Sequence, residues 1–107
     1  NGFRCIVTLD CGTTAFEQVD YANTLGLKVI ITDHHKPSDR LPKACAILNP
    51  LQPGCPYAFK DLSGCGVAFK FLVALCHRFE WPMSELLEQL DYRFLCSSQI
   101  LQSWVRI

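Results

Sequence analysis

The sequence has no surplus of charge and no long apolar run. Ten basic and ten acidic residues give the 107-residue chain a formal net charge of zero, so its overall charge does not indicate nucleic-acid binding. No apolar stretch approaches the ~18 residues that a membrane helix needs, and no basic start followed by an apolar run indicates a secretory signal. We therefore expect no membrane association and a cytoplasmic location, and any nucleic-acid partner has to be inferred from a site.

Cysteine pairs with the spacing of a zinc ribbon or a redox motif are also missing. The chain has seven cysteines, an odd number, and no two are separated by two residues. Several lie inside apolar runs, where a thiol behaves as a small hydrophobic group. We expect reduced structural thiols rather than a disulfide framework. The seven are Cys5, Cys11, Cys45, Cys55, Cys65, Cys76 and Cys96.

Half of the residues are apolar, which is enough for one small domain with a buried core. Residues 5–9 form a short β-rich run that ends at a turn signal, and Thr13 or Thr14 is a candidate cap for the helix that follows. Apolar residues then recur every three to four positions over residues 15–25, as in an amphipathic helix that ends before Gly26. Residues 28–32 are β-branched and apolar, as in a strand buried on both faces. This order predicts a βαβ unit with two parallel strands.

The second half of the chain predicts one further strand and two helices. Residues 44–48 suit a third strand, and the long apolar segment 66–79 suits a buried helix. Pro82 opens a second helix with an inward stripe of Met83, Leu86, Leu87 and Leu90. We therefore expect an α/β fold, with a parallel sheet and flanking helices in three layers.

Acidic and imidazole side chains follow the first two predicted strands. Asp10 follows one strand, and Asp33, His34 and His35 follow the other. Parallel sheets bind ligands at the carboxyl ends of their strands, and carboxylate with imidazole is a ligand set that divalent manganese, zinc or iron accepts. Each turn by itself also fits a plain surface loop. Two consecutive histidines are expected to point in different directions, so we assign His34 to a metal and His35 to a substrate phosphate, with Asp33 orienting an imidazole.

These residues belong to segments that resemble a known family. Residues 7–12 and 30–35 look like the second and third motifs of the DHH phosphoesterases. Residues 46–50 and 55–70 resemble the RecJ-type exonuclease branch, except that Ala58 replaces a usual proline. The similarity covers roughly residues 4–91, so the expected fold is part of a DHH phosphoesterase domain.

The resemblance implies roles for the site residues. Asp10 would be a metal ligand that bridges two ions, His34 a second ligand, His35 a contact of the scissile phosphate and Asp33 its support. The implied cofactor is Mn²⁺ or Mg²⁺, and the implied activity is metal-assisted hydrolysis that releases mononucleotides from the 5′ end of single-stranded DNA. Single-stranded DNA is the implied partner.

The ends of the chain depart from the family pattern. The first motif, an Asp-x-Asp pair, would precede Asn1, and the fourth, Gly-Thr-x-x-Asp, is absent from residues 92–107. We divide the chain into a partial DHH domain, residues 1–91, and an atypical tail, residues 92–107, that we expect to be out of frame. Without the flanking carboxylate motifs, we expect the isolated chain to be inactive.

Two other functions remain open. A DHH phosphodiesterase that acts on oligoribonucleotides or cyclic dinucleotides shares these motifs, although residues 46–50 and 64–70 argue against it. A non-catalytic remnant would agree with the tail. A flavodoxin-like domain ranks last, because no glycine-rich phosphate loop follows the first strand.

The expected frameshift is tested by sequencing the encoding DNA beyond both ends of the reading frame. We expect an upstream Asp-x-Asp motif, and in a shifted frame Gly-Thr-x-x-Asp followed by Gly-Glu-Asn. Codons can be chosen for residues 104–107 that give Gly-Glu-Asn when they are read from the third base. An uninterrupted gene with its own start and stop codons at these ends would contradict the frameshift.

Overall fold

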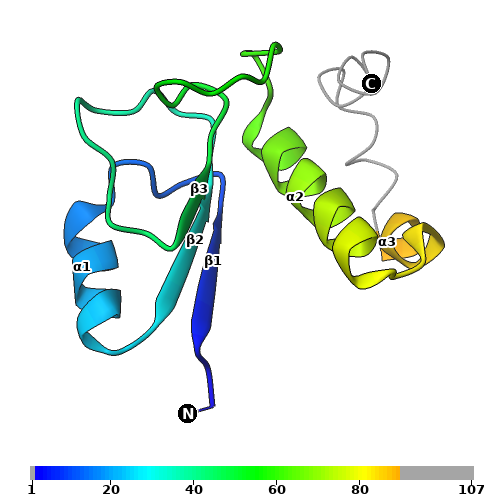
Figure 1. Ribbon diagram of the computed structural model, residues 1–107, viewed down its shortest axis with the longest axis horizontal. Coiled ribbons are helices and arrows are strands. Elements are labelled where there is room, and N and C mark those ends of the chain that lie inside the picture. Colours follow the sequence, from blue (N-terminus) through cyan, green and yellow to red (C-terminus); the bar gives the residue numbers. More distant parts are fainter. Residues whose placement is uncertain (1, 90–107) are drawn as a thin grey trace.

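The computed structural model describes residues 2–89 and contains three strands and three helices in that part of the chain (Figure 1). In chain order they are β1 (Cys5–Leu9), α1 (Phe16–Thr24), β2 (Lys28–Thr32), β3 (Ala46–Leu48), α2 (Gly64–Phe79) and α3 (Met83–Gln89). The strands and helices expected from the sequence are thus present. The tail, residues 92–107, and Leu90 of the expected helical stripe lie outside the described residues.

The three strands form one parallel sheet with the order β1-β2-β3. Leu9 pairs with Thr32, and Thr32 pairs with Leu48, so all three strands end at the same level. The expected βαβ unit and the expected parallel pairing are confirmed. Polar residues that follow the three strands are therefore brought to one edge of the sheet.

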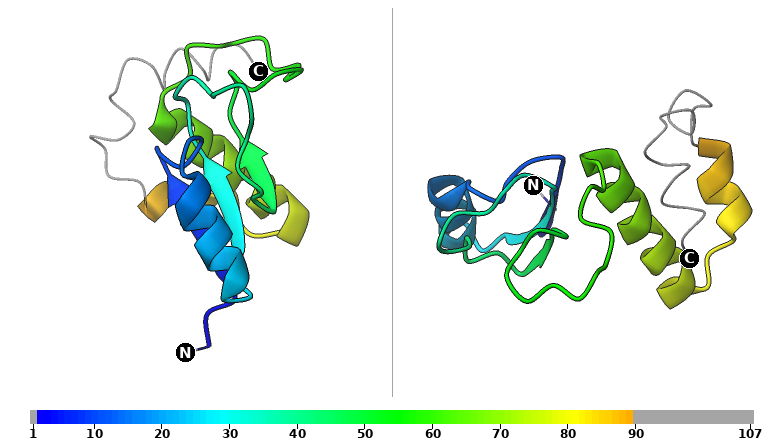
Figure 2. Two further views of the ribbon diagram at one scale, coloured as in Figure 1. Left: turned by 90° about the vertical axis from the view of Figure 1, so that its left-hand side faces the viewer. Right: turned by 90° about the horizontal axis from the view of Figure 1, so that it is seen from above.

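Helices lie on both faces of the sheet, which confirms the expected three-layer α/β fold. Figure 1 shows α1 on one side of the strands and α2 on the other, and the view from above in Figure 2 shows the same order of layers. The core between α1 and the sheet contains Val19, Ala22, Val29 and Ile31. Burial of a valine or isoleucine side chain stabilises a fold by about 1.5–3 kcal/mol.

Helix α1 is not capped by a threonine side chain as expected. Its N-cap is Ala15, which makes no side-chain cap hydrogen bond, and Thr13 is instead fully buried below the sheet edge. Leu25 of the expected apolar stripe is 58% exposed, whereas Val19 and Ala22 are buried. The predicted helix is correct, but the side chain of Thr13 has a tertiary rather than a local role.

Helix α2 is capped by Ser63, whose hydroxyl oxygen accepts a hydrogen bond from the backbone N–H of Gly66 at 3.1 Å. Val67, Ala68 and Phe69 are buried in its first half, so the expected buried helix is confirmed there. Further along, Leu72 is 39% exposed, because only one face of the helix meets the sheet. Leu87 of α3 is also exposed, and the side chain of Leu86 lies outside what the structure describes.

The remaining expectations concern the cysteines and membrane-spanning helices. The six cysteines in the described part are free thiols, and five of them are exposed or partly exposed. Among residues 2–89 no helix is long and apolar enough to cross a membrane.

Candidate metal centre

The candidate site lies at the edge of the sheet where the three strands end. Asp10 follows β1, Asp33 follows β2 and Asn49 follows β3. Backbone hydrogen bonds extend the sheet by one step, because the N–H of Asp10 donates to the carbonyl of Thr32 at 2.9 Å and the N–H of Asp33 donates to that of Leu48 at 3.0 Å. The three polar residues therefore stand in one row across the sheet.

Asp33 is the buried centre of this row. It is 1% exposed, and both carboxylate oxygens accept hydrogen bonds. One oxygen accepts from the backbone N–H of Thr13 at 2.9 Å. The other accepts from the backbone N–H groups of His34 and His35, at 2.8 and 3.2 Å, and faces the His35 Nδ1 at 2.6 Å. This carboxylate fixes the turn that carries both histidines.

The hydrogen bonds to Asp33 determine its charge. Burial raises the pKa of the Asp33 carboxyl, but the hydrogen bonds from Thr13 and His35 outweigh burial and hold that pKa well below its usual value. The hydrogen bond and the negative charge of Asp33 in turn raise the pKa of His35. Asp33 is therefore an anion that accepts only, and His35 Nδ1 is the donor of the bond between them.

The rings of His34 and His35 lie close together, although the side chains of two consecutive residues were expected to point in different directions. Their ring centroids are 4.6 Å apart, at an angle of 58°. His34 Nε2 lies 3.1 Å from Asp10 Oδ1, and one ligand atom from each of Asp10, His34 and His35 falls within 4.8 Å of the others. The expected divergence of the two rings is wrong, because the turn after Thr32 leaves the extended strand geometry on which that expectation depended.

Asp10 reaches the site through an unusual backbone conformation. Its φ is +62°, in the left-handed region that aspartate tolerates better than most residues do. Helix α2 begins against it, since a Cβ added at Gly64 would overlap with the Asp10 carboxylate. Gly64 is required because the helix start touches a candidate ligand.

In the sequence, Asn49 was noted only as part of residues 46–50, which resemble the RecJ-type branch, and it was given no role in the site. The structure shows it 2% exposed, with its side-chain amide hydrogen-bonded to the Thr13 hydroxyl oxygen at 3.0 Å and to the His35 carbonyl at 2.8 Å. A signal was present in the sequence, because Asn49 follows the third strand as Asp10 and Asp33 follow the first two.

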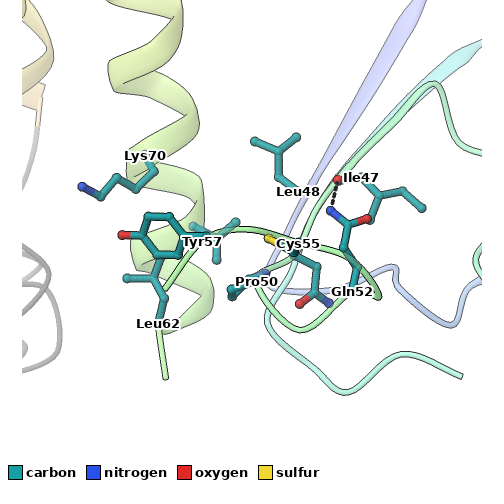
Figure 3. A pocket seen from close by; sticks show the side chains of 10 residues that line it. Ile47, Leu48, Pro50, Gln52, Cys55, Tyr57, Leu62 and Lys70 are labelled. Carbon is teal, nitrogen blue, oxygen red and sulfur yellow. Dashed lines mark hydrogen bonds between the residues drawn. The ribbon is translucent and has the colours of Figure 1, made fainter. Parts of the chain in front are cut away.

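A cavity of about 240 Å³ lies next to the site, between β3, the following loop and α2 (Figure 3). Its walls are mostly apolar and include Leu48, Pro50, Leu62 and Tyr57, and none of its lining residues is a histidine or a carboxylate. Gln52, also in the wall, donates to the Ile47 carbonyl at 3.0 Å. The cavity is thus distinct from the candidate metal centre.

The donor set of the site suits a divalent cation. One carboxylate and two imidazoles form the mixture that manganese, zinc and iron accept, whereas magnesium prefers oxygen ligands. The side chains of Asp10 and His34 are 56% and 35% exposed, and His35 is 62% exposed. The donors are therefore open to solvent and to a substrate, as a catalytic metal requires.

Comparisons with known proteins identify the family to which this chain belongs. The family described as the DHH family, N-terminal domain, matches residues 4–94. The single-stranded-DNA-specific exonuclease RecJ of Bacillus subtilis is 54% identical over 74 residues, which are 69% of this chain and 9% of that protein. The RecJ exonuclease of Escherichia coli is 47% identical over 74 residues, 69% of this chain and 13% of that protein. The chain thus spans about a tenth of the length of these relatives.

A solved structure is similar as well. A crystal structure of exonuclease RecJ bound to manganese matches 73% of this chain and 20% of its own chain, with a TM-score of 0.62 and 33% sequence identity. The similarity includes both the arrangement of the elements and the sequence. This chain belongs to the DHH family, and residues 4–94 correspond to the N-terminal domain of that family.

Proposed function

We propose that this chain is the metal-binding part of a 5′-to-3′ exonuclease that hydrolyses single-stranded DNA. One observation carries the proposal: ligand atoms of Asp10, His34 and His35 lie within 4.8 Å of one another at the carboxyl edge of a parallel sheet. The relatives from Bacillus subtilis and Escherichia coli, 54% and 47% identical, are single-stranded-DNA-specific exonucleases. A role in DNA processing would place the protein in the cytoplasm.

Asp10 and His34 are the proposed metal ligands. Their facing atoms are 3.1 Å apart, so one divalent ion can be held by both side chains after a small adjustment. Mn²⁺ is our first choice because one of the two proposed ligands is an imidazole nitrogen, whereas Mg²⁺ prefers oxygen ligands. Such an ion would supply Lewis-acid chemistry and a more acidic water. Among residues 2–89, only Asp10, His34 and His35 are grouped closely enough to serve as ligands at this site. Three side chains cannot complete the coordination of two ions, so further ligands would be water, substrate or groups outside the described part.

His35 is the proposed contact of the scissile phosphate. Its Nδ1 is occupied by Asp33, which leaves Nε2 to face the site. Because Asp33 raises the pKa of His35, a larger fraction of the ring carries a second proton at neutral pH, and Nε2 can donate it to a phosphate oxygen. Asp33 acts through His35 and is therefore a positioning residue.

Metal binding tests the assignment of the ligands. We expect Asp10→Asn and His34→Gln each to weaken Mn²⁺ binding on the order of 10- to 100-fold, at least the loss typical of altered supporting residues. Electron paramagnetic resonance of free Mn²⁺ in a titration measures this loss. Asp20→Asn and His77→Gln are matched controls, because both residues are exposed on helices. Equal affinities for the site variants and the controls would refute the assignment.

The charge of Asp33 is tested by stability as a function of pH. The pKa of Asp33 is lower in the folded chain than the value of about 3.9 expected in the unfolded chain, so its contribution is complete above pH ~4 and is lost as the pH falls further. In chelator-treated samples at neutral pH, Asp33→Asn should lower the free energy of unfolding by about 1–3 kcal/mol. Urea unfolding should show this difference shrinking below pH ~4. A difference that stays constant across that range would contradict an ionised Asp33.

A chimera tests the catalytic proposal. The matching 74-residue segment of Bacillus subtilis RecJ is replaced by that of this chain, and mononucleotide release from single-stranded DNA is followed with Mn²⁺. We expect an active chimera, and His35→Gln in it should lower the rate on the order of 10²- to 10³-fold, as for loss of a donor to the transition state. His77→Gln should have no effect. A folded, Mn²⁺-binding chimera without activity would contradict the proposal, and preferred cleavage of dinucleotides would favour the oligoribonucleotide or cyclic-dinucleotide alternative.

A further inference from the structure

We propose that Asn49 is a positioning residue that keeps His35 in a single ring tautomer and orientation. Asn49 is 2% exposed and stands one residue beyond the end of β3, in the same row as Asp10 and Asp33. The functional importance of His35 rests on the proposed function, whereas the hydrogen bonds of Asn49 do not depend on a metal.

The orientation of the Asn49 amide is fixed by its partners. Its oxygen accepts from the backbone N–H of Leu51 at 2.9 Å. Its nitrogen therefore faces the His35 carbonyl at 2.8 Å and the Thr13 hydroxyl oxygen at 3.0 Å. A carbonyl oxygen only accepts, so an N–H must point at His35. The opposite flip of the amide would place two acceptors against each other.

These bonds close a ring of four residues. Asn49 donates to the Thr13 hydroxyl oxygen, and the backbone N–H of Thr13 donates to Asp33 at 2.9 Å. Asp33 accepts from the His35 Nδ1, and the backbone carbonyl of His35 accepts from Asn49. Every link has one direction, because the carboxylate at Asp33 can only accept. Within residues 2–89 no buried side-chain nitrogen or oxygen lacks a partner.

The ring has a consequence for the reactive nitrogen of His35. With one proton held on Nδ1, Nε2 is the nitrogen that gains and donates the second proton. In the neutral ring Nε2 is unprotonated, which is the reverse of the form that a free histidine side chain prefers. Asp33 sets this tautomer, and Asn49 holds the backbone of His35 at the distance that the bond to Asp33 needs. A residue that only stabilised the fold would have no influence on the tautomer.

The test is an isosteric exchange, Asn49→Asp, which places a carboxylate oxygen against the His35 carbonyl. The readout is the pair of ¹⁵N chemical shifts of the His35 ring in the metal-free chain, in mildly alkaline buffer. We expect the wild type to show the proton on Nδ1 and the variant to shift toward the Nε2–H form. Mn²⁺ affinity should fall on the order of tenfold as well.

Asn23→Asp is the matched control. The Asn23 amide also donates to a backbone carbonyl, that of Lys43 at 3.0 Å, but it is exposed and comes from α1. We expect the wild-type tautomer and Mn²⁺ affinity in this control. A folded Asn49→Asp chain with the wild-type tautomer would overturn the proposal.

A second variant decides the question if Asn49→Asp does not fold. Thr13→Val removes only the hydroxyl from the ring and keeps the bond from the Thr13 backbone to Asp33. The same tautomer shift is expected, and an unchanged His35 ring in folded Thr13→Val would overturn the proposal. If the wild-type chain does not bind Mn²⁺, the proposed metal-dependent function fails, while the ring tautomers still decide the role of Asn49.

Discussion

The buried carboxylate of Asp33 is the interaction on which the rest of the site depends. It is withdrawn from water at the end of the central strand, where an unpaired charge would be strongly destabilising. Its two oxygens accept from Thr13, His34 and His35. These bonds keep the carboxyl ionised, hold the loop after β1 to that after β2 and direct one imidazole. One charged group thus connects folding to site geometry.

The register of the strands places the other residues of the site beside Asp33. Three parallel strands that end level bring Asp10, Asp33 and Asn49 into one row, although 39 positions separate the first from the last. Helix α2 then begins against Asp10, where the absent side chain of Gly64 leaves room. The site is therefore made from segments that are individually short, and each depends on neighbours that are distant in the sequence.

Much of this architecture could be predicted from local patterns. The apolar runs of residues 5–9 and 28–32 and the helical apolar period of residues 15–25 predicted the βαβ unit. The placement of Asp10 and His34 after neighbouring strands predicted that they meet. Local patterns failed where a side chain has a distant partner. Thr13 or Thr14 was expected to cap α1, but Thr13 is buried and hydrogen-bonded to Asp33 and Asn49. The approach of the His34 and His35 rings could not be predicted either, because it depends on how Asp33 shapes the turn.

The left-handed backbone at Asp10 affects how this position would vary in evolution. At a φ of +62°, few side chains other than aspartate, asparagine or glycine are free of steric strain. An aspartate retained among homologues at this place would therefore reflect two selective pressures, one on chain geometry and one on the proposed metal binding. In a homologue that had lost catalysis but kept the fold, we would expect asparagine or glycine at this position, because both tolerate the left-handed backbone. Any other residue here would indicate that the local backbone has changed as well.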